Sequence, residues 1–444
     1  MMRPFRNFIT TLFLSYITFV APAQADNRID GQRPDAPALA AYGSYEVGTR
    51  PVEMINAAQI DIVAIDPSAD RPAQFPTYDR PLTVQLWYPA FPGATGSQEL
   101  RAFMRDGRNE VGLNGQGTLW AAPIIGDGPF PLVIVSHGYP GNRFLMSHLA
   151  ENIASKGYIV ASIDHTDSTY RTLSAFGSTL VNRTLDQLFV LNEMERINND
   201  SSHFLQGLVD TSNTAVVGYS MGGYGALITA GAGVTQAAVD SPFGAPFGLL
   251  DVHLSGSDSH NNQPDSRIKT IVGFAPWGRQ IGFFSDDTMQ GISMPMMLLG
   301  GSVDDVSDYE NGIRAAWQGA TNSDRVLVTF DNANHNAGAP MPSPEEGYEF
   351  DPLLGFAPFE HYADAVWDNV RMNNISQHFV TAWLGKHLKN DAAMDAYLDL
   401  IPNSEDGVFS VDDDGAFTED HTYWTGFANR TAKGLHFERL NTGE

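Results

Sequence analysis

The feature that most constrains the fold of this chain is a regular alternation of short apolar segments with helical segments. Six runs of β-branched and other apolar residues are bounded by turn residues; they span 131–138, 158–165, 214–220, 268–277, 295–301 and 325–330. Continuous apolar runs of this length are typical of parallel strands that are buried on both faces. Segments with apolar residues three or four positions apart, such as Leu185 to Ile197, lie between several of them. The alternation predicts an α/β fold with a mostly parallel, doubly wound sheet.

The first 25 residues predict a signal peptide. They combine a positively charged start, an apolar stretch from Phe8 to Val20 and a small-x-small cleavage site at 23–25. The apolar stretch is shorter than the ~20 residues that a membrane span needs. We therefore expect an exported protein, periplasmic or extracellular, without a stable membrane span.

The remaining residues predict one large domain with two extensions. Residues 26–44 are rich in proline and charge and predict a flexible arm, whereas 45–390 predict the α/β domain itself. Residues 391–444 predict an acidic extension packed on that domain. Two long segments without periodicity, 232–266 and 336–360, predict cap loops that shape a binding pocket, because long structureless loops in compact domains usually serve function.

Charge and cysteine content exclude several classes of function. The formal net charge is −26, which disfavours binding to nucleic acid and to anionic lipid surfaces. The chain has no cysteine, which excludes disulfides, thiolate metal sites and a cysteine nucleophile. The acidic stretch 410–421 does not match a calcium loop, because Ser410 and His421 occupy the first and twelfth ligand positions.

A candidate nucleophile lies between a strand and a helix. Residues 218–222 read Gly-Tyr-Ser-Met-Gly, after the apolar run 214–220 and before a helix of small residues. Alone this pattern is weak, but the strand–turn–helix context is the one that a nucleophile elbow requires. The flanking glycines permit a tight turn that exposes the serine hydroxyl. The pattern predicts Ser220 as a catalytic nucleophile.

A serine nucleophile requires a base, and the base requires an orienting acid. In elbow-type enzymes the chain order is serine, acid, histidine. The strand 295–301 is followed by Asp304 and Asp305, and the strand 325–330 is followed by His335. We therefore expect His335 as base and Asp304 as acid, with Asp305 as the alternative acid and His361 as the nearby rival base.

The developing oxyanion requires two N–H donors. One is expected from the backbone of Met221, directly after the nucleophile, and the other from Tyr139 in the loop after the strand 131–138. His137 precedes the serine in the chain, and we expect it to fix this loop. Trp277, at the end of another strand, is a candidate for lining the substrate cleft.

Further polar residues near strand ends are expected to be structural. Asp164 and His165 end one strand, and Arg183 and Asp186 share a helix. Such groups more often serve as hydrogen bonds that fix loops, or as partly buried ion pairs, than as catalytic groups.

With these motifs in place, the chain resembles the α/β-hydrolase superfamily over residues 45–390. The segments SHGYPGNR, GYSMGG, GGSVDDV and NANH carry the resemblance, which is closest to the branch called dienelactone-hydrolase-like or platelet-activating-factor-acetylhydrolase-like. The APW segment at 275–277 is also similar to cutinase-like polyester hydrolases. The resemblance implies Ser220, Asp304 and His335 as a triad, with Tyr139 and Met221 as oxyanion donors. True dienelactone hydrolases use a cysteine, so this chain departs from their chemistry.

Together these features predict a secreted serine esterase that acts on small-molecule or lipid-like esters through an acyl-enzyme, with no metal or organic cofactor. Two alternatives use the same triad: a phospholipase-like acetylhydrolase and a cutinase-like polyester hydrolase. A third is a non-catalytic binding protein on a hydrolase scaffold. The sequence does not define acyl or alcohol specificity, oligomeric state or the role of the acidic extension.

Overall fold

The computed structural model describes residues 26–174 and 176–444, so the predicted signal peptide lies outside the described residues. The strands are β1 (Glu46–Ile60), β2 (Thr77–Ala90), β3 (Glu99–Phe103), β4 (Glu110–Asn114), β5 (Thr118–Leu119), β6 (Phe130–Ser136), β7 (Ile159–Ile163), β8 (Val209–Tyr219), β9 (Ile268–Phe274), β10 (Met296–Gly301), β11 (Arg325–Phe330) and β12 (Leu435–Leu440). Ten of them form one sheet in the order β12-β11-β10-β9-β8-β6-β7-β2-β1-β5, and β3 pairs with β4 in a separate hairpin.

The centre of the large sheet is parallel. Strands β7, β6, β8, β9, β10 and β11 run in the same direction, and β2 and β12 join them antiparallel on the two sides. The six predicted apolar runs correspond to these six parallel strands. Their residues are almost all buried, because helices cover both faces of a parallel sheet. The predicted α/β fold is confirmed.

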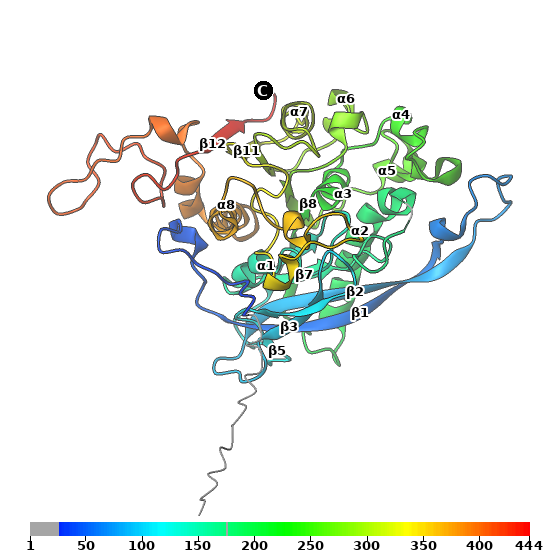
Figure 1. The fold of residues 1–444 in the computed structure, drawn as a ribbon, viewed down its shortest axis with the longest axis horizontal. Coiled ribbons are helices and arrows are strands. Elements are labelled where there is room, and N and C mark those ends of the chain that lie inside the picture. Colours follow the sequence, from blue (N-terminus) through cyan, green and yellow to red (C-terminus); the bar gives the residue numbers. More distant parts are fainter. Residues whose placement is uncertain (1–25, 175) are drawn as a thin grey trace, which may run out of the picture.

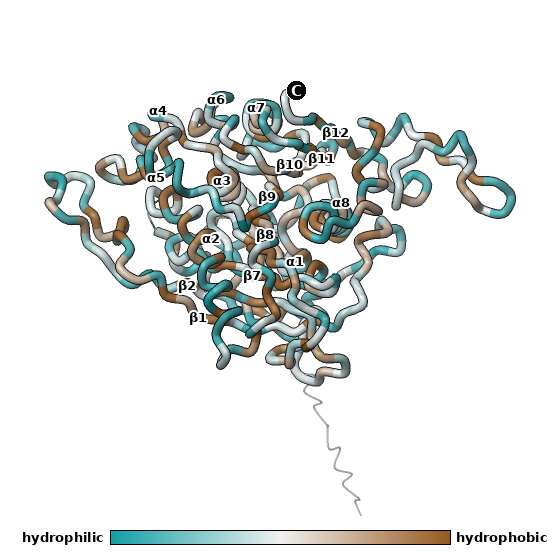
Figure 2. Tube along the Cα trace, turned by 180° about the vertical axis from the view of Figure 1, so that it is seen from behind, coloured by the Kyte–Doolittle hydropathy of each residue, from teal (hydrophilic) through white to brown (hydrophobic). Residues whose placement is uncertain are grey.

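Helices lie on both faces of this sheet (Figure 1). The α-helices are α1 (Ser147–Ala154), α2 (Phe176–Asn199), α3 (Met221–Thr229), α4 (Gln236–Val239), α5 (Asp258–Asn261), α6 (Asp286–Met289), α7 (Ala315–Gly319) and α8 (Asn369–Lys389). Helix α1 packs with α8, and α2 packs with α3. In Figure 2, hydrophobic stretches follow the central strands, which matches the buried residues of the core. This arrangement brings the carboxyl ends of the parallel strands to one edge, where open α/β sheets bind their ligands.

The segment 26–44, predicted as a flexible arm, packs against the domain instead. Ile29 is buried, and the backbone N–H of Leu39 donates to Nδ1 of His378 at 3.1 Å. The Lys156 ammonium donates to the Leu39 carbonyl oxygen at 2.6 Å. These bonds satisfy backbone groups of the segment and hold it against α1 and α8.

The acidic extension contributes to the sheet as well as packing on it. Its strand β12 pairs antiparallel with β11 from Arg325↔Leu440 to Phe330↔Leu435. Trp424 and Phe427 pack their rings near that of Phe379 on α8. Between α8 and these contacts, the exposed turn around 411–417 projects away from the domain (Figure 1).

Candidate active site

The turn between β8 and α3 brings Ser220 to the sheet edge in a strained conformation. Its φ is 52° and its ψ is −110°, a positive φ that residues with a side chain rarely adopt. The adjacent glycines are required for close approach: a Cβ at Gly218 would overlap the Gly222 carbonyl group, and a Cβ at Gly222 would overlap the Ser136 carbonyl oxygen in β6. The Gly-x-Ser-x-Gly pattern therefore lets a strand, a helix and a neighbouring strand meet at one tight turn.

Three side chains from three loops form a hydrogen-bonded chain at this turn. The Ser220 Oγ lies 3.0 Å from Nε2 of His335, and His335 Nδ1 lies 2.8 Å from Oδ2 of Asp304. Asp304 follows β10 and His335 follows β11, so each side chain stands just beyond the carboxyl end of a parallel strand. The structure brings these three sequence-predicted residues together.

The geometry distinguishes the two adjacent carboxylates, Asp304 and Asp305, as partners of His335. The side chain of Asp304 is fully buried, and its Oδ1 accepts the backbone N–H groups of Val306 at 2.9 Å and Ser307 at 2.8 Å. These two bonds aim the other oxygen, Oδ2, at His335. The neighbouring Asp305 is exposed, and its side chain makes no hydrogen bond among the described residues.

The rival base His361 lies in the same cavity as Ser220 but has different contacts. Its ring packs edge-on against those of Tyr170 and Tyr362, and its Nε2 is buried with no hydrogen-bond partner among the described residues. Burial, with the charge of Arg105 acting in the same direction, lowers the pKa of His361 to about 3. This imidazole is therefore neutral near pH 7.

Of the two expected oxyanion donors, Met221 directly follows Ser220 in the chain, and Tyr139 lines the same cavity as Ser220. Met221 is the first residue of α3, so its N–H is among those at the helix start that have no intrahelical acceptor. The peptide that carries the Tyr139 N–H is fixed by His137, whose Nδ1 lies 2.7 Å from the Gly138 carbonyl oxygen. The His165 backbone N–H donates to Nε2 of His137 at 3.2 Å, which leaves Nδ1 as the protonated nitrogen.

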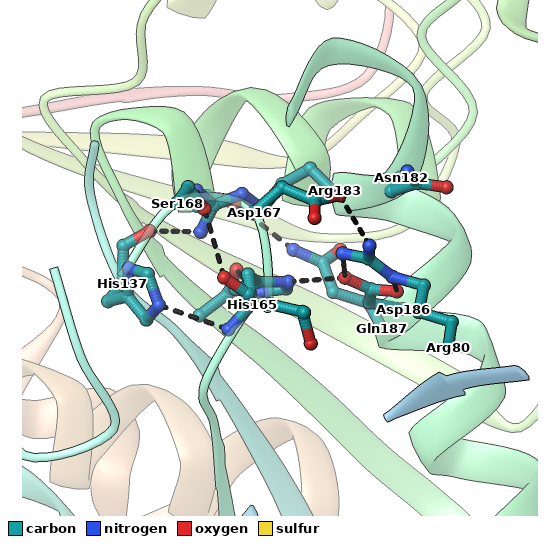
Figure 3. A network of polar contacts seen from close by, with 12 residues as sticks. Arg80, His137, His165, Asp167, Ser168, Asn182, Arg183, Asp186 and Gln187 are labelled. Atoms are coloured by element: carbon teal, nitrogen blue, oxygen red, sulfur yellow. Dashed lines mark hydrogen bonds and ion pairs between the residues drawn. The ribbon is translucent and has the colours of Figure 1, made fainter. Parts of the chain in front are cut away.

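A buried polar network supports this loop from behind (Figure 3). The Arg183 guanidinium donates to the His137 carbonyl oxygen at 2.6 Å and to the Ser168 hydroxyl at 2.7 Å. His165 is held by Asp186, whose Oδ2 lies 2.9 Å from its Nδ1, and Arg80 forms an ion pair with the same carboxylate. The predicted structural roles of these polar residues agree with this arrangement.

The electrostatics of the network keep its histidines neutral. Burial, followed by the charge of Arg183, lowers the pKa of His137 well below its ordinary value and that of His165 to about 3. Burial opposes ionisation of Asp186, but the adjacent Arg80 outweighs it and holds the pKa of that carboxyl below its usual range. A neutral His137 donates through one nitrogen and accepts through the other, as its two contacts require.

Trp277 lies beside the nucleophile but does not line its cavity. Its backbone N–H donates to the Ser220 carbonyl oxygen at 3.2 Å, and its ring packs edge-on against Phe176 at 5.3 Å. Phe176 in turn contacts Tyr139, which does line the cavity. Trp277 thus fixes the turn at Ser220 and packs behind Phe176, which supports the cavity-lining ring of Tyr139.

The cavity over Ser220 has a volume of about 560 Å³. It is lined by Tyr139 and Tyr219, by residues that follow β10 and β11, and by a stretch from Phe359 to Ala365. Asn336, Phe359 and Glu360 of the segment 336–360 are among these lining residues. The segment 232–266 contributes none of the described lining residues; instead it packs near α2, where His253 Nε2 lies 2.8 Å from the Val181 carbonyl oxygen.

Sequence reasoning missed the lining residues Glu360 and Asp364 and an asparagine that orders the cavity. Asn336 accepts from the Tyr219 hydroxyl at 2.9 Å and donates to the Ala363 carbonyl oxygen at 2.7 Å. Its position directly after His335 was the available signal, since a side chain beside a strand-end base is close to the site.

Neither a metal cluster nor a transmembrane helix is found in the described part of the chain. No group of three or more His, Asp or Glu side chains there is arranged to hold a metal ion. In residues 26–174 and 176–444, no helix combines the length and the apolar character needed to cross a bilayer.

Comparison with known proteins adds a family match and several enzymes. A family model described as "PETase: PET hydrolase-like" matches residues 108–247. Cutinase 2 of Thermobifida cellulosilytica is 23% identical over 278 residues, which cover 62% of this chain and 75% of that protein. Cutinase cut1 of Thermobifida fusca is also 23% identical over 278 residues, which cover 62% of this chain and 61% of that protein.

Two further relatives extend the comparison. A bis(hydroxyethyl) terephthalate hydrolase of Streptomyces coelicolor is 22% identical over 222 residues, which cover 50% of this chain and 55% of that protein. Among solved structures, a ferulic acid esterase from Streptomyces cinnamoneus superposes with a TM-score of 0.56 at 20% identity, covering 84% of this chain and 96% of that one. The predicted resemblance is confirmed: the chain shares an α/β-hydrolase fold with this esterase and is similar to PET hydrolase-like proteins and cutinases, which indicates a carboxylic ester hydrolase.

Proposed function

We propose that this protein is a secreted serine esterase that works through an acyl-enzyme, with Ser220, His335 and Asp304 as its triad. The observation that carries the proposal is the pair of contacts from Ser220 Oγ to His335 Nε2 at 3.0 Å and from His335 Nδ1 to Asp304 Oδ2 at 2.8 Å. A serine hydroxyl is a weak nucleophile until a base in hydrogen-bond reach removes its proton. Asp304 keeps the proton of neutral His335 on Nδ1, so that Nε2 is free to accept.

The reaction proceeds in two steps, acylation of Ser220 and hydrolysis of the acyl-enzyme. As the Ser220 Oγ bonds to the ester carbonyl carbon, its proton passes to His335 Nε2. The tetrahedral intermediate then breaks its bond to the alcohol oxygen, which leaves with that proton. Water attacks the acyl-enzyme in the same way, and the products are a carboxylic acid and free Ser220.

Two backbone N–H groups, of Met221 and Tyr139, stabilise the negative oxygen of the tetrahedral intermediate. The start of α3 supports this role for Met221, since helix N-termini favour negative charge. The His137 contact to the Gly138 carbonyl oxygen supports the role of Tyr139, because it fixes the orientation of the peptide that carries its N–H. Each such donor typically contributes about 10²- to 10³-fold to kcat.

The rim of the cavity favours the polyester alternative over the phospholipid one. Phe359 lines the cavity and Tyr348 packs edge-on against Phe359, and the same segment carries the exposed apolar residues Phe350 (67% exposed) and Leu353 (77% exposed). An exposed apolar patch at a catalytic mouth suits a water-insoluble, uncharged polymer. The net charge of −26 disfavours anionic lipid surfaces.

The experiment that tests the triad is active-site labelling. The protein is treated with a fluorophosphonate, beside a Ser220→Ala variant, and the labelled peptide is mapped by mass spectrometry. We expect labelling at Ser220 that is absent in the variant. A folded protein that is not labelled would favour the non-catalytic binding protein.

Substrate class is then tested on a polyester film, a short-chain phospholipid and a soluble phenyl ester. We expect product release from the film and the soluble ester. Hydrolysis confined to the phospholipid would instead identify the acetylhydrolase alternative.

Export is proposed on the sequence pattern of residues 1–25. N-terminal sequencing of protein recovered outside the cytoplasm is expected to begin at Asp26. Protein that keeps the N-terminal segment would contradict cleavage at that site.

A further inference from the structure

The charged groups that line the catalytic cavity are predominantly negative. Three carboxylate side chains line it: Asp305 follows β10, Glu360 lies in the short helix Pro358–His361, and Asp364 precedes α8. Asp305 comes from one loop and the other two from the stretch Phe359 to Ala365, and all three line the cavity that contains Ser220. Among the described residues that line it, none is a lysine or an arginine.

Nothing in the lining neutralises these carboxylates. Asp305 and Glu360 are exposed, and neither forms an ion pair among the described residues. Asp364 accepts three backbone N–H groups, those of Asn334, Val366 and Trp367, and no ion pair links it to a described residue. His361 is neutral near pH 7 because burial depresses its pKa to about 3.

Two arginines act on lining residues from outside the cavity, Arg183 on Tyr139 and Arg105 on His361, and neither of them lines it. The Arg105 guanidinium lies over the Phe356 ring at 5.6 Å and is not a lining residue. The resting field inside the cavity is therefore negative.

Aromatic rings share the lining with the carboxylates. Tyr139 and Phe359 line the cavity, and the Tyr219 ring packs near His335 at 5.2 Å between centroids. Rings combined with carboxylates are the surroundings in which proteins bind quaternary ammonium groups, which they contact through the faces of the rings.

We propose that this cavity prefers esters that carry a positive charge near the scissile bond, with quaternary ammonium esters foremost, and rejects esters that carry a free carboxylate. The inference rests on the proposed esterase function of Ser220. For a neutral substrate the same field has a second effect. It repels the carboxylate product that hydrolysis creates and so favours its release.

A matched series of three acetate esters tests the proposal. The esters are acetylcholine, its neutral tert-butyl isostere, and the analogue with a carboxylate in place of the trimethylammonium group. At low ionic strength we expect kcat/KM to fall on the order of tenfold at each step from cation to neutral to anion, as a few weakly screened charges would cause. At ~1 M salt the ratios should approach unity, because screening shortens the reach of these charges.

Variants separate the local field from the net charge of the protein. The double variant Asp305→Asn, Glu360→Gln should reduce the cation-to-neutral ratio to less than about threefold. Glu349→Gln changes the charge of the same loop region at an exposed residue outside the lining, and should leave the ratio as in the wild type. Equal kcat/KM values for the three esters would overturn the proposal. A cation-to-neutral ratio that the double variant leaves unchanged would overturn it as well.

A binding measurement keeps this test independent of turnover. In Ser220→Ala, calorimetry should give a Kd for acetylcholine about tenfold below that for the neutral isostere. If no ester is hydrolysed but this preference is present, the esterase proposal fails and the charge inference stands. If the esters are hydrolysed without a charge preference in either measurement, the esterase proposal stands and the charge inference fails.

Discussion

At the scale of single residues, the backbone of Ser220 is the most constrained feature of the site. Its positive φ costs about 1–3 kcal/mol and is tolerated because the turn is held from both sides. The Ser220 N–H donates to the Phe274 carbonyl oxygen at 2.8 Å, and the Ser220 carbonyl oxygen accepts from Tyr224 and Trp277. The hydroxyl is thereby fixed before any substrate arrives.

Asp304→Asn is expected to lower kcat by about 10⁴-fold with little change in folding. The asparagine oxygen can still accept from Val306 and Ser307, but its amide then donates to His335 Nδ1 and forces the proton onto Nε2. That tautomer cannot accept the serine proton. Steady-state kinetics on a soluble ester measures the loss.

The matched control is Asp308→Asn, which makes the same chemical change in the same loop, at a residue that caps the turn Tyr309–Arg314 outside the cavity. It should change stability by less than ~0.5 kcal/mol, because asparagine and aspartate are about equally good N-cap residues, and should lower kcat by less than about twofold. Near wild-type turnover in Asp304→Asn would contradict the assignment of the acid.

Positions at strand ends were predictable, whereas positions on long loops were not. Ser220, Asp304 and His335 follow apolar runs, so the rule that parallel strands end at one edge brings them together before any coordinates are known. The sequence left Asp304 and Asp305 unresolved, because only the path of the loop decides which one turns inward. Glu360 reaches the cavity through a loop without periodicity, and no local pattern encodes that path.

At the scale of elements, the elbow depends on contact between α3 and β6. Gly222→Ala would insert a Cβ into the Ser136 carbonyl oxygen and push the helix away from the strand. We expect a loss of at least ~2 kcal/mol in the free energy of unfolding, together with loss of fluorophosphonate labelling. Denaturant titration and labelling provide the two measurements.

Gly128→Ala serves as the control for this change. The nearest atom to its added Cβ would be a Phe130 ring carbon at 3.4 Å, an ordinary contact distance. It should keep both stability and labelling. A Gly222→Ala variant that behaves the same way would show that the close approach is not required.

The strand β12 is one of the elements that the sequence did not reveal. Residues 435–440 read LHFERL, an alternating pattern with charges that an edge strand adopts when only one face is buried. Its partner β11 lies more than a hundred residues earlier in the chain, so no local signal connects the two. The hairpin of β3 and β4 was missed for a related reason, since short strands with exposed charges lack a continuous apolar run.

Phe437→Ala tests how much β12 contributes to the fold. This side chain is buried, and its ring stacks on Phe379 of α8 at 5.7 Å. We expect a loss of about 3–5 kcal/mol. Glu438→Gln, which breaks the partly exposed ion pair with Arg314 on the other face, should cost at most ~1 kcal/mol. Equal losses for the two variants would contradict the packing role of β12.

At the scale of the whole molecule, buried histidines set the acid limit of stability. Burial lowers the pKa of His148, His165, His361 and His378 to about 3 each. In the unfolded chain they titrate near ~6.5, so the unfolded state binds more protons as the pH falls below that value. Their contribution is present above pH ~6.5 and is lost as the pH falls towards ~3.

Between pH ~7 and pH ~5.5 each of these histidines should cost about 1 kcal/mol of folding free energy. His148→Leu should remove one such contribution, because burial is the main cause of the low pKa of His148. Urea unfolding of both proteins at the two pH values measures the difference. A variant with an unchanged pH dependence would refute this account.

The way in which β12 is attached has a consequence for how this protein can be divided. Six residues of the extension complete the sheet, while the exposed turn around 411–417 connects them to the rest. A cut in that turn would leave two pieces joined by the β11–β12 ladder and by the rings around Phe379. The enzyme is thus a natural candidate for fragment complementation, in which the short C-terminal piece, added as a separate peptide, restores activity to the long N-terminal piece.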